Sequence, residues 1–175
     1  MSHIRPCWND YFFDIMHTVS SRATCDRGRS GCVIVKNNHI LSTGYVGSPS
    51  KLQSCDDEGH MFEGRFEKLM IKDGKPFQCT IALEPKDYHV HCVRTIHAEM
   101  NAILYSARYG ISLEGSDLYC TMTPCRTCAM SIISVGIINV YCERRHNQAC
   151  DAEALFPVAG VRLTYKYPNE TQKYE

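Results

Sequence analysis

The sequence predicts an α/β protein, a three-layer α-β-α sandwich around a mixed sheet of about five strands. Two observations predict this fold. Segments with helical apolar spacing alternate with short β-branched runs along the 175 residues, in the order α-β-β-(insert)-α-β-α-β-α-β. The composition, 44% hydrophobic and 22% charged, is typical of a globular protein with a single core.

A helix and a hairpin are predicted in the first 45 residues. Residues 8–19 carry apolar side chains at helical spacing, which predicts a helix with one buried face. Two β-branched runs, 31–36 and 39–45, flank the pair Asn37-Asn38, a turn sequence that favours a hairpin.

A long connection follows at residues 48–95, rich in glycine and proline, with a short helix expected around 62–71. A connection of this length inside a compact domain needs a function or a structural staple. We expect residues 1–167 to form one domain that includes this insert, and residues 168–175 to form a polar tail.

The second half alternates between helices and strands. Gly110 is expected to end the first of these helices, and Thr123 to cap the second with Pro124 at its first position. The predicted helices are 96–109, 125–135 and 152–159, and the predicted strands are 118–122, 139–142 and 161–165.

The charge balance limits the expected partners. The 19 basic and 19 acidic side chains cancel, and the pI is near 7.0. A protein that holds long nucleic acid by neutralising phosphates is therefore not expected. No membrane partner is expected either, because the longest apolar stretch, near residues 132–140, is too short to span a bilayer.

Eleven cysteines are more than ordinary usage. The start of the chain, MSHIRPCWNDYF, lacks the apolar run of a secretion signal, so we expect the protein in the cytoplasm, or in the host cytoplasm if it is viral. Clustered cysteines in a reducing compartment indicate metal binding more often than disulfides.

A catalytic zinc site is predicted at two helix starts, residues 97–99 (His-Ala-Glu) and 124–128 (Pro-Cys-Arg-Thr-Cys). Cys125 and Cys128 lie one turn apart, so both sulfurs can reach one ion, and the helix N-terminus favours their thiolate form. His97 supplies a third ligand. A catalytic zinc uses three protein ligands and keeps one position for water.

Glu99 is the candidate proton shuttle. It lies two residues from His97, too far around the helix to bind the same ion in the same way, but it can face the zinc-bound water. The pattern H-x-E…P-C-x-x-C is the known signature of zinc deaminases. The alternatives are a redox pair or a structural zinc site, which needs a fourth protein ligand and has no use for Glu99.

Most of the chain resembles the deoxycytidylate (dCMP) deaminases of the cytidine deaminase superfamily, so a cytidine deaminase-like fold is expected. The long segment through Ile103 is the most specific part of this resemblance. The resembling segments are 22–25, 31–35, 42–45, 47–49, 91–103, 118–121 and 136–137.

The resemblance implies hydrolysis of dCMP to dUMP and ammonia, which supplies thymidylate synthesis. It also implies a homohexamer that dCTP activates and dTTP inhibits. His97, Cys125 and Cys128 match the family's zinc ligands and Glu99 its proton shuttle. Arg108 matches a family arginine near the active site and is a candidate for holding the substrate phosphate; the alternative is a water-facing charge at a helix end.

One loop departs from the family pattern. The family reads G-Y-N-G where this chain has Tyr45, Val46 and Gly47 after Gly44. The family's asparagine contacts nucleotide, and valine has no hydrogen-bonding side chain. Either this allosteric nucleotide loop handles nucleotides differently, or a neighbour compensates, or the substitution is neutral.

A second, structural zinc is also implied by the resemblance, with ligands at positions matching Cys25, Cys55, His60 and His91. Such an ion pins a long insert that has few apolar residues. Because His91 and Cys92 point in different directions in an extended chain, at most one of them is expected to ligate. The alternative is a set of buried thiols and surface histidines.

Two other functions remain open at this point. A deaminase that acts on a base in RNA or single-stranded DNA calls for a basic groove, which the neutral charge does not favour. A non-catalytic zinc nucleotide sensor is expected to have lost the shuttle carboxylate, and Glu99 is present.

Overall fold

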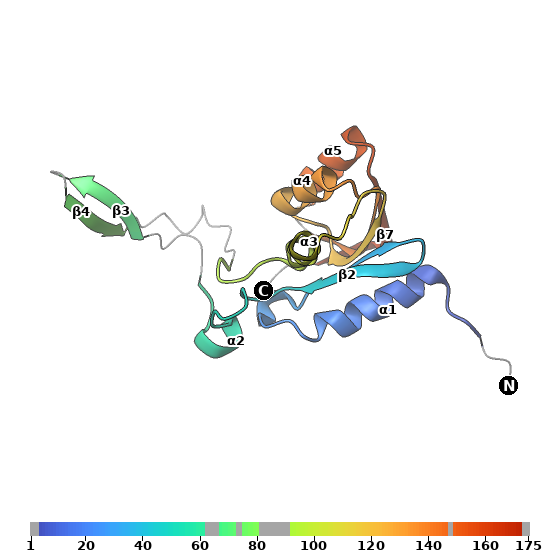
Figure 1. Ribbon diagram of the computed structural model, residues 1–175, viewed down its shortest axis with the longest axis horizontal. Helices are drawn as coiled ribbons and strands as arrows, with labels where there is room; N and C mark the ends of the chain where they lie inside the picture. The colour runs from blue at the N-terminus through green and yellow to red at the C-terminus, as the bar shows by residue number, and fades with distance from the viewer. Residues whose placement is uncertain (1–3, 62–66, 73–74, 81–91, 147–148, 173–175) are drawn as a thin grey trace.

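The computed structural model describes residues 4–61, 67–72, 75–80, 92–146 and 149–172. Its main sheet has five strands in the order β2-β1-β5-β6-β7 (Figure 1). β1 is antiparallel to β2 and β5, whereas β5, β6 and β7 are parallel, so the predicted mixed sheet is confirmed. The strands are β1 (Gly31–Lys36), β2 (His39–Tyr45), β5 (Asp117–Met122), β6 (Asn139–His146) and β7 (Arg162–Gln172).

Helices cover both faces of this sheet, which confirms the three-layer sandwich (Figure 1). On one face α1 packs against Val33 and Val35 of β1, and on the other face Cys32 and Ile34 belong to the core formed with the remaining helices. This alternation follows from the two-residue period of a strand. The helices are α1 (Trp8–Ser20), η1 (Asp26–Gly28), α2 (Cys55–Glu58), α3 (Ala98–Tyr109), α4 (Arg126–Ser134) and α5 (Cys150–Val158).

Two predicted turns are confirmed. Asn37 and Asn38 both have positive φ, +51° and +62°, and join β1 to β2 as the left-handed turn that matches strand twist. Gly110 ends α3 with φ of +66°, a conformation that glycine adopts at little cost.

The helix expected around residues 62–71 is wrong over residues 67–71; residues 62–66 lie outside the described residues. Glu67–Lys72 forms β3, which pairs antiparallel with β4 (Lys75–Thr80). Cross-strand pairing outweighs the local helical spacing. The sequence held a signal for this hairpin, because Asp-Gly at 73–74 is a common two-residue turn.

The polar tail expected at 168–175 is strand as far as Gln172. After an irregularity at Arg144/Arg145, Thr171 pairs with Arg145 and Gln172 with His146. Pro168 is tolerated because β7 is an edge strand, where a missing N–H leaves no neighbouring strand unpaired.

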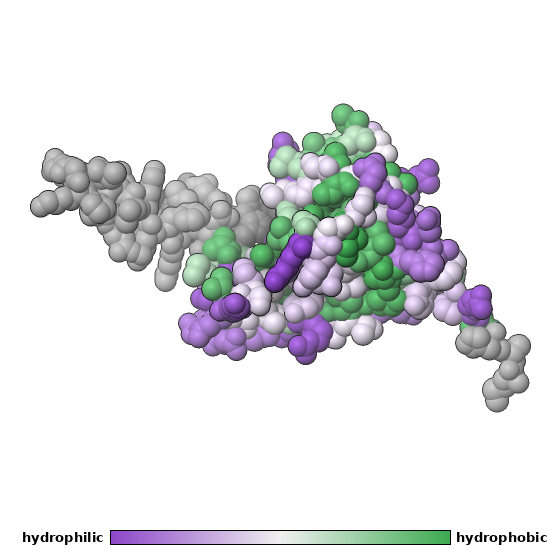
Figure 2. All heavy atoms as spheres, in the orientation of Figure 1, coloured by the Kyte–Doolittle hydropathy of each residue, from purple (hydrophilic) through white to green (hydrophobic). Residues whose placement is uncertain are grey.

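The surface drawn in Figure 2 is hydrophilic around α2 and carries apolar side chains over α4 and α5. No helix within the described ranges is both long enough and apolar enough to cross a bilayer.

β2 and α3 approach each other more closely than any side chain at Gly44 would permit. A Cβ atom at Gly44 would lie 2.2 Å from the Ala98 carbonyl oxygen and 2.5 Å from the Ala102 nitrogen. Nearby, the Ser42 hydroxyl donates to the Ala102 carbonyl at 2.8 Å. The start of α3 is therefore positioned directly on the sheet.

We predict that Gly44→Ala destabilises the fold, because its methyl group meets backbone atoms that cannot move independently. The expected loss is about 1–3 kcal/mol or more of unfolding free energy, measured by denaturant titration. Thr43→Ala, at the exposed neighbouring position, is the control and should change stability much less. Equal stability of Gly44→Ala and wild type would contradict the close packing.

Candidate functional site

Two helix starts bring three metal-binding side chains together. His97 and Cys125 lie at the N-cap positions of α3 and α4, and Cys128 lies in the first turn of α4. His97 Nδ1 is 3.5 Å from Cys125 Sγ and 3.6 Å from Cys128 Sγ. Tetrahedral zinc ligands at about 2.0–2.3 Å from the ion stand about 3.5 Å apart, so this donor set fits one zinc ion.

The N-cap residue of α4 differs from the sequence expectation and is itself one of the three donors. Cys125 takes the N-cap position instead of Thr123, and the helix begins at Arg126. The Thr123 hydroxyl instead accepts a hydrogen bond from the His146 N–H at 3.1 Å and contacts the Tyr165 hydroxyl at 3.1 Å. Thr123 thus connects the end of β5 to β6 and β7.

One of the three donors ionises readily, whereas a hydrogen bond with Cys125 and burial raise the pKa of the Cys128 thiol. The hydrogen bond from the Cys128 thiol, assisted by His97, lowers the pKa of Cys125 to about 3. The hydrogen bond with Cys125 raises the pKa of His97 to about 9. The protein part of the site therefore holds a thiolate beside a proton-carrying imidazole, and a metal ion can take the place of that proton.

Glu99 is buried, with 8% of its surface exposed, in the first turn of α3. Burial raises the pKa of its carboxyl group above the usual range, and the charge on His97 opposes this rise. Glu99 lines the same cavity as the three metal donors. A buried carboxyl group with a raised pKa is suited to accept and return a proton.

The cavity has a volume of about 570 Å³ and lies at the carboxyl ends of β5 and β6. Arg126 is the only lysine or arginine among the described residues that line it. The Ser30 hydroxyl is buried and has no hydrogen-bond partner within the described part of the chain. Four further residues that no sequence motif assigns to the site also line the cavity: Ser30, Arg126, His146 and Asp151. For Arg126, its place inside the C-x-x-C motif is a signal that the sequence offers.

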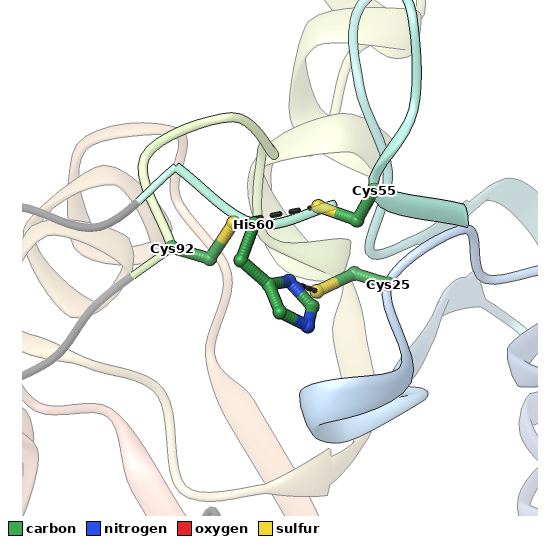
Figure 3. Close-up of side chains that lie close together, drawn as sticks. All are labelled: Cys25, Cys55, His60 and Cys92. Carbon is green, nitrogen blue, oxygen red and sulfur yellow. Dashed lines mark hydrogen bonds between the residues drawn. The ribbon is translucent and has the colours of Figure 1, made fainter. Parts of the chain in front are cut away.

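A second cluster consists of Cys25, Cys55, His60 and Cys92, whose donor atoms all lie within 4.8 Å of one another (Figure 3). Cys25 Sγ is 3.7 Å from His60 Nδ1, and the sulfurs of Cys55 and Cys92 are 3.4 Å apart. The predicted ligand His91 lies outside the described residues, and Cys92 completes the group of four. Three sulfurs and one imidazole fit a closed structural zinc site.

The surroundings of this cluster also fit a metal site. Asp26 Oδ1 lies 3.0 Å from His60 Nε2, so a carboxylate orients the ring and leaves Nδ1 facing the cluster. Burial opposes ionisation of Cys92, but the backbone N–H groups of Arg94 and Met61 lower its pKa to about 7. The Val93 N–H donates to the Met61 carbonyl at 2.8 Å, which joins the two ends of the insert.

The predicted nucleotide loop lies between the two clusters. Val46 is buried against Cys25, Cys55 and Cys92 and also lines the cavity. The backbone of Gly47 exchanges hydrogen bonds with Ile96, at 3.2 and 2.9 Å, immediately before His97. Tyr45 is 38% exposed. The loop therefore forms part of the cavity wall.

Arg108 does not reach this cavity. It is exposed near the end of α3, and its guanidinium lies over the Tyr109 ring, 5.7 Å from the centroid. Arg108 lies nine positions after Glu99, which corresponds to about 13.5 Å along a helix. The structure does not bring this predicted phosphate ligand to the site.

Comparisons with known proteins agree with this geometry. A family model for the cytidine and deoxycytidylate deaminase zinc-binding region matches residues 6–144. The deoxycytidylate deaminase of Enterobacteria phage T2 is 38% identical over 165 residues, which cover 85% of this chain and 87% of that protein. ComE operon protein 2 of Bacillus subtilis is 37% identical over 159 residues, 91% of this chain and 71% of that protein.

A solved structure supports the same relationship. The dCMP deaminase of cyanophage S-TIM5, crystallised with dCMP and dUMP, aligns with a TM-score of 0.66 at 26% identity. The alignment covers 93% of this chain and 99% of that chain. Together with the paired helix starts and their zinc donors, these matches show that the chain belongs to the cytidine and deoxycytidylate deaminase family of zinc-binding deaminases.

Proposed function

We propose that this protein hydrolyses dCMP to dUMP and ammonia and thereby supplies dUMP for thymidylate synthesis. The observation that carries the proposal is the buried carboxyl group of Glu99 in one cavity with three zinc donors. The relatives named deoxycytidylate deaminases support the choice of dCMP as substrate.

His97, Cys125 and Cys128 would hold the catalytic zinc. With three protein donors one coordination position would stay available for a water molecule, whose pKa the ion would lower toward neutrality. With the ion bound, the two thiolates and the neutral imidazole would compensate its charge.

Glu99 moves the protons of the reaction. Its carboxylate accepts a proton from the attacking water and delivers it to the pyrimidine ring nitrogen, while a C–O bond forms at the carbon that bears the amine. The second proton of the water then goes to the leaving amine, the C–N bond breaks, and ammonia departs. All atoms of water and dCMP are thus accounted for in dUMP and ammonia.

Cys25, Cys55, His60 and Cys92 would hold a second, structural zinc. Its role is to anchor the insert beside the catalytic cavity, since Cys92 and Val93 both line that cavity. The ten cysteines whose side chains the structure describes are free thiols, which is the form that zinc binding and a cytoplasmic location require.

Assembly and regulation form the last part of the proposal. Leu104, Tyr105 and Tyr109 leave a half-exposed apolar stripe on α3, which supports burial in a homohexamer. dCTP as activator and dTTP as inhibitor would act through the loop at Tyr45, Val46 and Gly47. Because Val46 has no polar side-chain atoms, any hydrogen bonds to nucleotide there must come from the backbone or from neighbouring residues.

We predict that Glu99→Gln retains the catalytic zinc but loses activity about 100- to 10,000-fold, because ligation survives while proton transfer does not. Turnover of dCMP is followed by the change in cytosine absorbance, and zinc is measured by elemental analysis. Near-normal turnover with full zinc content would contradict the role of Glu99.

The substrate assignment is tested by offering dCMP, deoxycytidine and a cytosine-containing oligonucleotide to the zinc-loaded protein. We expect dCMP to be the preferred substrate. Turnover of the oligonucleotide alone would instead support a base deaminase, and absence of turnover with intact zinc would support a nucleotide sensor.

We predict about two zinc ions per chain, one for each cluster. Cys55→Ser should reduce the content to about one and lower the thermal stability. Cys142→Ala, a buried thiol outside both clusters, is the control and should keep both ions while losing some packing energy. A single zinc ion in the wild-type protein, together with wild-type stability of Cys55→Ser, would contradict the proposed structural zinc site.

We predict that Asp26→Asn weakens zinc binding at the second cluster about tenfold, because His60 loses the carboxylate that orients it. Competition with a chromogenic chelator measures this affinity. Asp56→Asn is the matched control, since Asp56 is exposed, adjacent to Cys55, and paired with Arg29 rather than His60. Equal affinities in the two variants would argue against the orienting role.

A further inference from the structure

We propose that Arg126 binds the 5′-phosphate of the nucleotide and that Asp151 is the partner it leaves when the phosphate arrives. This inference rests on the proposed function, because it assumes a pyrimidine nucleotide in the cavity. Arg108 lies outside the cavity of its own subunit.

Arg126 is placed where a phosphate group would be expected. It is the first residue of α4, directly after the zinc donor Cys125, and its side chain is 59% exposed while still lining the cavity. When the base faces buried Glu99, the charged end of a nucleotide remains toward the solvent. A guanidinium group matches a phosphate with two parallel hydrogen bonds.

The ion pair between Arg126 and Asp151 is weak enough to exchange. Its nitrogen–oxygen distance is 3.5 Å, and both side chains are about half exposed. An exposed pair of this kind contributes little stability. By contrast, Arg145 donates to both oxygens of Glu153 at 2.6 and 2.7 Å, a geometry that is costly to break.

Asp151 can stay folded without Arg126. It lies in the first turn of α5, where the helix dipole stabilises a carboxylate. Releasing Arg126 therefore leaves Asp151 with a favourable interaction of its own. While the pair is intact, however, Asp151 competes with phosphate for the same guanidinium group.

The test compares binding of dUMP and deoxyuridine, which differ only in the phosphate, to the zinc-loaded protein by calorimetry. Arg126→Gln should lower the affinity for dUMP about 10- to 100-fold and change the affinity for deoxyuridine less than about twofold. Asp151→Asn should raise the affinity for dUMP several-fold, because the carboxylate that competes with phosphate for Arg126 is gone. The affinity for deoxyuridine should stay unchanged. Arg126→Lys keeps the positive charge but lacks the two parallel N–H donors of a guanidinium group. This variant should therefore retain part of the dUMP affinity that Arg126→Gln loses.

Arg144→Gln and Glu170→Gln are the controls, because they disrupt another exposed ion pair, at 3.0 Å, outside the cavity. Zinc content and circular dichroism establish that each variant is folded and loaded. If Arg126→Gln keeps the wild-type preference for dUMP, or loses both ligands equally, Arg126 does not bind the phosphate. If Asp151→Asn weakens the binding of dUMP, phosphate does not replace Asp151 as the partner of Arg126.

These failures differ from failure of the proposed function. A wild-type protein that turns over dCMP while Arg126→Gln keeps its dUMP preference overturns this inference alone. A wild-type protein that binds dUMP no better than deoxyuridine overturns both the phosphate subsite and the choice of a monophosphate substrate.

Discussion

The functional geometry depends on a single constraint, the position of two helix starts at one end of the sheet. Because β5 and β6 are parallel, the chain must return through α4, and α4 begins at the carboxyl end of β5. β1 is antiparallel to β5, so Gly31 reaches the same end and donates to the Thr121 hydroxyl at 3.0 Å. α3 is held there by its close contact with β2 at Gly44. The cavity lies at the carboxyl ends of the parallel strands β5 and β6, which is where ligands bind in open α/β sheets.

The two cysteine clusters lie next to each other and are connected by residues that contact both the second cluster and the cavity. Val46 packs on the second cluster and lines the cavity, and Cys92 belongs to both the second cluster and the cavity wall. The five residues from Cys92 to Ile96 lead directly to His97. A metal ion on the second cluster would therefore stabilise the segment that delivers a ligand to the first.

The ion pairs made by the two helix α5 carboxylates Asp151 and Glu153 differ in how firmly they are held. Arg145 is bound through two short hydrogen bonds to Glu153, which also accepts from the Tyr165 hydroxyl at 3.0 Å, so α5 is braced against β6 and β7. Arg126 has one long contact with Asp151. The firmly held Arg145 fixes the position of α5, whereas the loosely paired Arg126 is available to a ligand.

The sequence by itself determined the fold class and predicted that His97, Cys125 and Cys128 group together with Glu99 in the same cavity. Alternation of helical and strand periodicity is local, and so is the spacing that places Cys125 and Cys128 on one helix turn. Only the tertiary structure decided that Cys92 joins the second cluster and that Arg108 lies outside the cavity. These features depend on contacts between residues far apart in the chain, and local spacing carries no information about which distant side chains will meet.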